Sequence, residues 1–206
     1  MYLPEKFAES RSEELFRLMR EHPLGMLVTH TSSGLEANHL PFLLDEGRSA
    51  LLAHVARANP IWREVNEGAE VLVVFRGAQG YISPNWYPTK QETHRHVPTW
   101  NYEVVHAHGR IHVRDDEKFV RGVVARLTRT HEGGEPQPWK MTDAPEDYIA
   151  EQLSHIVGIE VELTRLEGKR KLSQNREPRD FNGTVSALDE RGCKDLASAM
   201  RRALGE

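Results

Sequence analysis

Cysteine is nearly absent from the chain: Cys193 is the single one among 206 residues. One thiol cannot form a disulfide within the chain, which favours a reducing compartment. Long apolar runs are absent as well, and none approaches the roughly 20 residues that a membrane-spanning helix needs. The first residues lack the basic and then apolar pattern of a secretory signal. The sequence therefore predicts a cytoplasmic protein with no membrane segment.

Several signatures of function are also missing. The chain has no glycine-rich phosphate loop of the Rossmann or Walker type, so a nucleotide cofactor would have to be held in another way. No spacing of Ser, His and Asp or of Cys and His indicates a catalytic arrangement, so any chemistry would depend on a cofactor. The formal net charge of −4 does not support DNA as a direct partner. The sequence leaves open whether the protein is an enzyme.

What is present is typical of a soluble globular protein, with 38% hydrophobic and 28% charged residues. No repeat, low-complexity tract or linker divides the chain. We therefore predict a single domain over residues 1–206, which ends in a helical tail at about 180–206.

Runs of apolar or alternating residues predict strands joined by short turns, with helices inserted between them. This order predicts a mainly β fold with inserted helices (α+β) and an antiparallel sheet or small barrel. Pro41 indicates an edge strand or a bulge. The expected strands cover residues 24–30, 36–45, 50–55, 70–75, 79–83, 101–114 and 156–166, and the main helices cover 7–22, 59–66, 115–130, 145–154 and 194–204.

Two stretches, residues 97–102 and 168–176, carry side chains that core packing alone would not select. The first presents the rings of Trp100 and Tyr102 beside the Asn101 amide. The second carries several cationic and amide groups just after the last predicted strand. Flat aromatic surface and convergent donors fit a planar, anionic cofactor. The alternatives are an aromatic mini-core and a solvated basic turn.

A further candidate lies where the third strand ends and a short helix begins. Arg57 and Asn59 follow His54 there, and Pro60 comes next. Backbone N–H groups at a helix N-terminus favour an anion, which Arg57 could bind through two donors. The alternative is that Asn59 only caps the helix and Arg57 is solvated.

Histidines alternate along the predicted strand 101–114, where His106, His108 and His112 fall on one face. With His94 and His96 nearby in sequence, zinc or haem ligation is a weaker alternative. No cysteine or carboxylate cluster completes such a set, so we predict no metal site.

Short specific strings run nearly from end to end of the chain: Met1–Pro4, Asn38–Phe42, His54–Pro60, Tyr81–Pro84, Val97–Tyr102, Pro138–Lys140, Ile156–Glu160 and Lys171–Arg176. In these strings and in their order the chain resembles the PaiB family, whose members are described as FMN-binding negative transcriptional regulators. The resemblance implies an FMN-binding split β-barrel of the antiparallel Greek-key type. It also implies a homodimer with flavin at the subunit interface.

On this resemblance, the phosphate of FMN would be held by Arg57 and Asn59 with help from Lys171 or Arg176. Trp100, Asn101 and Tyr102 would lie near the flavin rings. Further candidate cofactor contacts are His39, His54, His106, Ser173 and Gln174. The expected function is that of a PaiB-type regulator, and the alternative is a flavin-dependent oxidoreductase acting on a small molecule.

Overall fold

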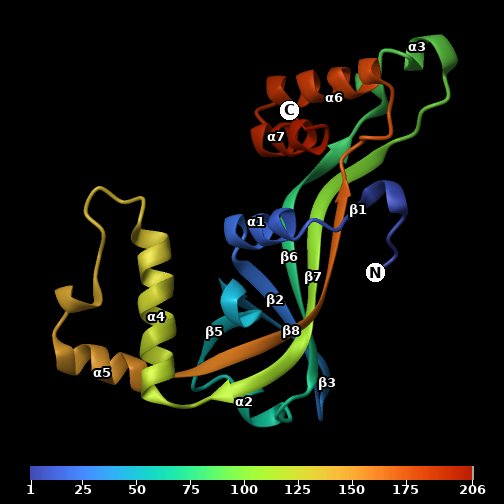
Figure 1. Cartoon of the computed structure of the whole chain (residues 1–206). Helices are drawn as coiled ribbons and strands as arrows, with labels where there is room; N and C mark the ends of the chain where they lie inside the picture. The colour runs from blue at the N-terminus through green and yellow to red at the C-terminus, as the bar shows by residue number, and fades with distance from the viewer. Residues whose placement is uncertain (206) are drawn as a thin grey trace. The chain divides into compact units, whose positions relative to one another are not determined.

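The structure is a computed structural model that describes residues 1–205 (Figure 1). Its strands are β1 (Ala8–Glu9), β2 (Leu24–Thr31), β3 (Gly34–Pro41), β4 (Leu43–Asp45), β5 (Ala50–Ala56), β6 (Glu70–Ile82), β7 (Thr99–Arg114) and β8 (Ile156–Lys171). Its helices are α1 (Ser12–Glu21), α2 (Ile61–Glu64), α3 (Lys90–Thr93), α4 (Glu117–Glu132), α5 (Glu146–Ser154), α6 (Pro178–Glu190) and α7 (Lys194–Ala203). No helix within residues 1–205 has the length and apolar character needed to cross a membrane.

The strands form one open sheet in the order β3-β2-β6-β7-β8-β5-β4, and β1 pairs with β8. The registered pairs β2–β3, β2–β6, β4–β5 and β5–β8 are all antiparallel. The prediction of a mainly antiparallel sheet with inserted helices is therefore confirmed. Pro41 ends β3, which lies at one end of the strand order, as expected for a residue that cannot donate to a neighbouring strand.

The chain divides into two compact units. Unit 1 contains Met1–Leu18, Arg76–Val105 and the segment from Glu167 onward, and unit 2 contains Met19–Phe75 and His106–Leu166. Strands β6, β7 and β8 continue from one unit into the other. The single domain over residues 1–206 stays a prediction.

Unit 1 has a hydrophobic core around its two C-terminal helices. α6 and α7 are neighbouring helices in Figure 1. Their buried side chains pack with Ile82 and Leu172 from the ends of β6 and β8, and with Tyr87 from the segment that follows β6. The predicted helical tail is thus an amphipathic pair of helices that completes this core.

Unit 2 contains the β2–β3 hairpin, in which Thr31 pairs with Gly34 next to the turn, and the pair β5–β8. Helix α4 covers β5 through Val123 and Leu127, which lie in one buried cluster with Leu52. Helix α5 packs on α4, where Ile149 contributes to a second cluster.

Several predicted element boundaries differ from the structure, and the predicted strands 70–75 and 79–83 are one continuous strand, β6. β8 extends to Lys171 because β1 pairs with it, with Ala8 opposite Lys169. The same short strand delays the first helix, which begins at Ser12. The predicted strand 36–45 is interrupted at Phe42, whose N–H donates to the Pro23 carbonyl at 2.8 Å.

Candidate functional site

Three cations of unit 1 lie near one another, and two of them lie beside aromatic rings. Lys169 and Lys171 are two residues apart on β8, so their side chains leave the same face of the strand. The Lys169 ammonium lies 5.5 Å from the centre of the Tyr102 ring and donates a hydrogen bond to the Tyr2 carbonyl at 3.0 Å. The Arg176 guanidinium lies 5.0 Å from the centre of the Tyr87 ring. We call Lys169, Lys171 and Arg176 the cation cluster.

The cation cluster concentrates positive charge without a neutralising acid. Burial lowers the pKa of Lys171, and repulsion from Lys169 and Arg176 lowers it further. The Lys171 ammonium donates to the Thr99 hydroxyl and to the Trp100 carbonyl. No carboxylate within residues 1–205 forms an ion pair with any member of the cluster. An anion bound there would relieve this repulsion, so the donor set fits a phosphate group.

The turn that follows β8 is fixed by internal hydrogen bonds. Asn101 is 1% exposed, and its amide donates to the Ser173 hydroxyl at 2.9 Å. Ser173 adopts φ +63°, a left-handed conformation that side chains other than glycine seldom occupy. The Gln174 amide accepts from the Leu172 N–H at 2.8 Å and donates to the Lys6 carbonyl at 3.1 Å. Asn101, Ser173 and Gln174 thus shape the turn that follows Lys171 and precedes Arg176.

Aromatic surface is available in the same unit. Trp100 is 50% exposed, and its ring meets the ring of Tyr81 edge to face at 6.4 Å. Tyr102 is half-buried beneath the Lys169 ammonium. The ring of Trp100 therefore retains free area on which a flat molecule could stack.

In unit 2, Arg57 is engaged by protein groups. Its guanidinium donates to both oxygens of Asp115, at 2.9 and 2.6 Å, and to the carbonyls of Ser154 and Ile156. The hydrogen bonds from Arg57 lower the pKa of Asp115, although burial opposes them. Arg57 is thus paired with an acid, so an anion would have to compete with Asp115.

The side-chain oxygen of Asn59 accepts from the N–H of Ile61, the first residue of α2, at 3.0 Å, and Pro60 occupies the N-cap position. The amide nitrogen of Asn59 donates to the Asn38 side chain at 2.7 Å, so both ends of the amide have partners. His54 lies on β5, and burial lowers its pKa and favours the neutral ring. Its Nδ1 is buried with no hydrogen-bond partner within residues 1–205, so it is available to a ligand or a water. His39 is exposed on the edge strand β3.

The histidines named in the sequence lie in different surroundings. In unit 2, the rings of His106 and His108 have their centres 6.4 Å apart, and His112 pairs with Glu67 at 2.6 Å. In unit 1, His96 shares a hydrogen bond of 2.8 Å with the Thr89 hydroxyl, and His94 follows α3. These contacts use several of the rings in protein hydrogen bonds. The role of His106 as a cofactor contact stays a prediction.

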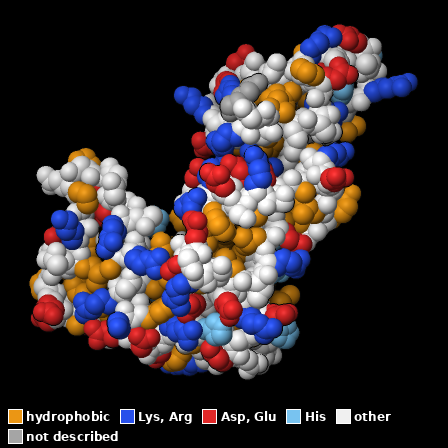
Figure 2. Space-filling model, in the orientation of Figure 1, with side chains coloured by type: hydrophobic (Ala, Val, Ile, Leu, Met, Phe, Trp, Pro, Cys, Tyr) orange, Lys and Arg blue, Asp and Glu red, His pale blue; other side chains and the backbone are white. Residues whose placement is uncertain are grey.

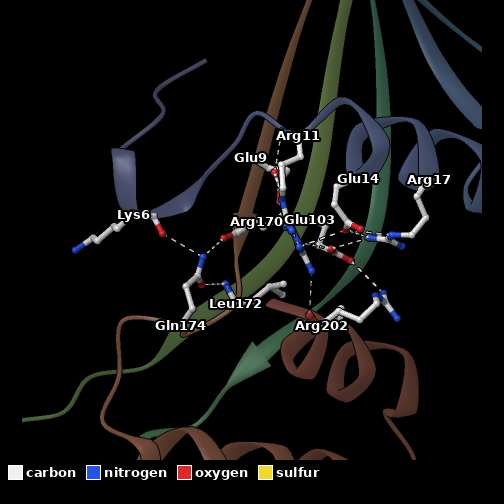
Figure 3. Close-up of polar contacts among 11 residues, drawn as sticks. Lys6, Glu9, Arg11, Glu14, Arg17, Glu103, Arg170, Leu172, Gln174 and Arg202 are labelled. Atoms are coloured by element: carbon white, nitrogen blue, oxygen red, sulfur yellow. Dashed lines mark hydrogen bonds and ion pairs between the residues drawn. The ribbon is translucent and has the colours of Figure 1, made fainter. Parts of the chain in front are cut away.

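A buried ion network in unit 1 has no counterpart in the sequence predictions (Figure 3). Glu103 on β7 is 2% exposed and accepts from the Arg170 guanidinium at 2.9 Å. Arg170 also pairs with Glu9 and with Glu14, each at 3.3 Å. It further donates to the Ala199 carbonyl of α7 at 3.4 Å. We call Glu9, Glu14, Glu103 and Arg170 the ion network.

The ion network and its neighbours link five elements of unit 1, namely β1, α1, β7, β8 and α7. Arg17 of α1 lies 3.1 Å from Glu14 and 3.6 Å from Glu103, and Arg202 of α7 lies 3.9 Å from Glu103. The network thereby joins α1 and α7 to the central strands of the same unit (Figure 3). One signal in the sequence could have identified Glu103 as buried: it lies two residues after Asn101, on the inward face of an alternating strand.

The ion network also predicts how stability depends on pH. Burial raises the pKa of Glu9, but hydrogen bonds from the side chain and the N–H of Arg11, with a further one from Arg170, lower it from 4.5 to about 2. Because the pKa of Glu9 is lower in the folded state, its ionised form stabilises the fold above about pH 5. We expect that contribution to be lost as the pH falls from about 5 towards 2.

Urea unfolding at several pH values checks this expectation. The Glu9→Gln variant should show a flatter fall in the free energy of unfolding between about pH 5 and 2 than the unsubstituted chain. Glu135→Gln removes an exposed carboxylate outside the network and serves as control. Equal slopes for all three proteins would contradict the role given to Glu9.

The sequence of the chain matches a known protein family. The family model described as "Putative FMN-binding domain" matches residues 1–165. The match thus includes Arg57, Asn59 and Trp100 and ends before the cation cluster.

Two relatives and one solved structure resemble the chain over most of its length. An uncharacterised protein of Aspergillus fumigatus is 33% identical over 240 residues, which cover 93% of this chain and 92% of that protein. The protease synthase and sporulation protein PAI 2 of Bacillus subtilis is 28% identical over 205 residues, which cover 97% of this chain and 96% of that protein. The FAD and heme binding protein of Mycobacterium smegmatis has a similar fold, with a TM-score of 0.58 at 18% identity over 89% of this chain and 80% of that chain.

Proposed function

Because the chain belongs to the family of FMN-binding domains, which matches residues 1–165, we propose that it binds FMN and acts as a PaiB-type negative regulator of transcription. The observation that carries the binding half is the cation cluster. It holds three positive side chains together without an acidic partner within residues 1–205. Bound FMN would supply reversible electron transfer.

In this proposal the cation cluster binds the phosphate. Lys169 and Lys171 provide ammonium donors, and Arg176 provides a guanidinium that can bind two phosphate oxygens at once. Trp100 and Tyr102 provide ring faces for the flavin, and Asn101, Ser173 and Gln174 keep the intervening turn in place. All these residues belong to unit 1.

The candidates of unit 2 form a second proposed set of cofactor contacts. His54 is the strongest of them, because its buried Nδ1 lacks a partner within the described residues and can accept a hydrogen bond. Arg57 and Asn59 are proposed with it, and both would have to exchange a present partner for the cofactor. His39 and His106 complete the set.

A flavin titration tests the binding half. The purified protein should carry flavin absorbance or take up FMN at micromolar concentration. Lys171→Gln should weaken FMN binding about tenfold or more, because a hydrogen bond between charged groups contributes about 1.5–3 kcal/mol. Lys194→Gln makes the same change at the exposed start of α7 and should leave the affinity within about twofold.

Two results would count against the proposal in different ways. No flavin uptake at micromolar FMN would contradict cofactor binding altogether. Tight FMN binding that is unchanged in Lys171→Gln would leave the cofactor in place and remove the phosphate from the cation cluster. In that case Arg57→Ala tests the second set.

We also propose a regulatory role, a homodimer and a cytoplasmic location. The support for a regulatory role is the likeness to the protein PAI 2 of Bacillus subtilis, whose name refers to protease synthesis and sporulation. A mobility shift on DNA upstream of the protein's own gene tests direct regulation. If local cations carry DNA binding despite the net charge of −4, binding should weaken as salt rises, with a slope set by the number of phosphates contacted. Absence of a shift at low salt would contradict direct DNA binding, and light scattering gives the number of subunits.

The exposed ring of Trp100 favours a second function, a flavin-dependent oxidoreductase that acts on a small molecule. Open aromatic surface beside the proposed cofactor would let a flat substrate approach it. Addition of NADH or NADPH separates the two functions: bleaching of the flavin supports the oxidoreductase, and a flavin that stays oxidised supports the regulator.

A further inference from the structure

A cavity of about 430 Å³ lies in unit 2 between helix α4 and the segment that follows it. After α4 the chain turns back and returns along the helix towards α5 (Figure 1). The cavity is lined by Ala125 and Arg129 of α4 and by Pro138, Trp139, Lys140 and Met141 of the returning segment. Its volume falls within the roughly 300–1,000 Å³ of small-molecule sites.

The returning segment is held in place by specific contacts. The Trp139 N–H donates to the Glu132 carboxylate at 2.8 Å, which fastens the wall to the last turn of α4. The Lys140 N–H donates to Asp143 at 2.9 Å, and the Asp143 N–H returns a bond to the Lys140 carbonyl at 2.8 Å. Met141 packs against the buried cluster between α4 and α5. The cavity wall is therefore a formed structure that needs no ligand to assemble.

The wall of the cavity is mainly apolar, and positively charged side chains lie beside the apolar ones. Trp139 is 42% exposed although its backbone is fixed, so ring area remains available for stacking. Figure 2 shows hydrophobic side chains gathered between basic ones over α4 and the segment after it. Arg129 and Lys140 line the cavity, and neither forms an ion pair with a carboxylate within the described part of the chain. The one acid in the wall, Glu132, is occupied by the Trp139 N–H.

We propose that this cavity binds a small aromatic anion, with its ring against Trp139 and its carboxylate or other acidic group between Arg129 and Lys140. An apolar ring with one negative group matches both parts of the wall. The site goes beyond the proposed function, because it uses none of the residues assigned to FMN. It also gives a role to the string Pro138–Lys140, which the flavin proposal leaves without one.

Calorimetric titration of the full chain with 2-naphthoate tests the proposal. 2-Naphthamide has the same ring and no charge, so it separates the contribution of the cations from that of the apolar wall. We expect 2-naphthoate to bind, and the neutral amide to bind at least about fivefold more weakly. Arg129→Gln and Lys140→Gln should each weaken 2-naphthoate by about fivefold and change 2-naphthamide by less than about twofold. Trp139→Ala should weaken both ligands.

Arg121→Gln is the matched control, because it removes an exposed cation from the same helix outside the cavity. Circular dichroism and thermal unfolding show whether each variant folds. If Trp139→Ala does not fold, the two glutamine variants still test the proposal. Absence of 2-naphthoate binding would overturn the proposal, and so would equal affinity for the two ligands. Displacement of 2-naphthoate by FMN would also overturn it, because the cavity would then belong to the flavin site. If the protein binds 2-naphthoate but does not bind FMN, the proposed function is refuted and the proposal for the cavity stands.

Discussion

Replacement of Glu103 by alanine is expected to lower the free energy of unfolding by about 3–5 kcal/mol. The Glu103 side chain is 1% exposed, and its partner Arg170 is 6% exposed, so neither is well screened by water. Without Glu103, the Arg170 guanidinium would keep only longer contacts, to Glu9 and Glu14 at 3.3 Å and to the Ala199 carbonyl at 3.4 Å. A buried charge that loses its main partner costs several kcal/mol, far more than an exposed one.

Urea unfolding at neutral pH measures this loss. Glu117→Ala is the control, because Glu117 pairs with Arg121 on the surface of α4 at exposed fractions of 69% and 40%. That substitution should cost no more than about 1 kcal/mol. Glu103→Gln keeps an acceptor and should fall between the two. A loss for Glu103→Ala no larger than that of the control would show that the ion network does not stabilise unit 1.

Gly168→Ala is expected to cost about 3 kcal/mol or more. Gly168 of β8 lies opposite Glu9 of β1, and α1 passes over the same position. A β-carbon at residue 168 would lie 2.1 Å from the Leu15 side chain and 2.8 Å from the Glu9 carbonyl oxygen. The second contact is with backbone, so a change of rotamer cannot relieve it. Either β1 separates from β8 or α1 is displaced.

Thermal unfolding distinguishes this effect from a general response to alanine. Gly122→Ala lies in α4, where an added β-carbon would meet nothing within 4 Å. Because glycine is a poor helix former, that substitution should stabilise the protein by about 0.5–1 kcal/mol. Opposite shifts of Tm are therefore expected from the same chemical change. A Gly168→Ala protein that melts with the unsubstituted chain would show that β1 and α1 do not pack there as described.

The sequence was most informative where one side of an element faces the core. Strand β7 alternates over most of its length, so its inward residues Val105, Ala107 and Ile111 could be identified before the structure. The specific strings predicted the PaiB relationship, the flavin-binding fold and FMN as the cofactor, and the family match and the likeness to PAI 2 confirm these predictions.

Contacts between distant segments could not be predicted in the same way. Arg170 and Glu103 are 67 residues apart, and nothing in either local pattern indicates that they meet. Arg57 was predicted to contact an anion, and its local pattern does not indicate that Asp115, 58 residues later, provides a carboxylate partner. Two-residue β1 is too short to produce a periodic signal, yet its pairing with β8 extends that strand to Lys171. Charge pairing and strand pairing of this kind depend on the fold as a whole.

The division of unit 1 into three separate segments has a consequence for the order of events during synthesis. Unit 2 is complete in sequence once Leu166 has been made, whereas unit 1 still awaits the segment from Glu167 onward. Glu9 and Glu103 therefore leave the ribosome well before Arg170, their shared partner. Lys169, Lys171 and Arg176 arrive in the same late segment. Since domains form as their chain emerges, the proposed phosphate site is completed only after unit 2 is able to fold.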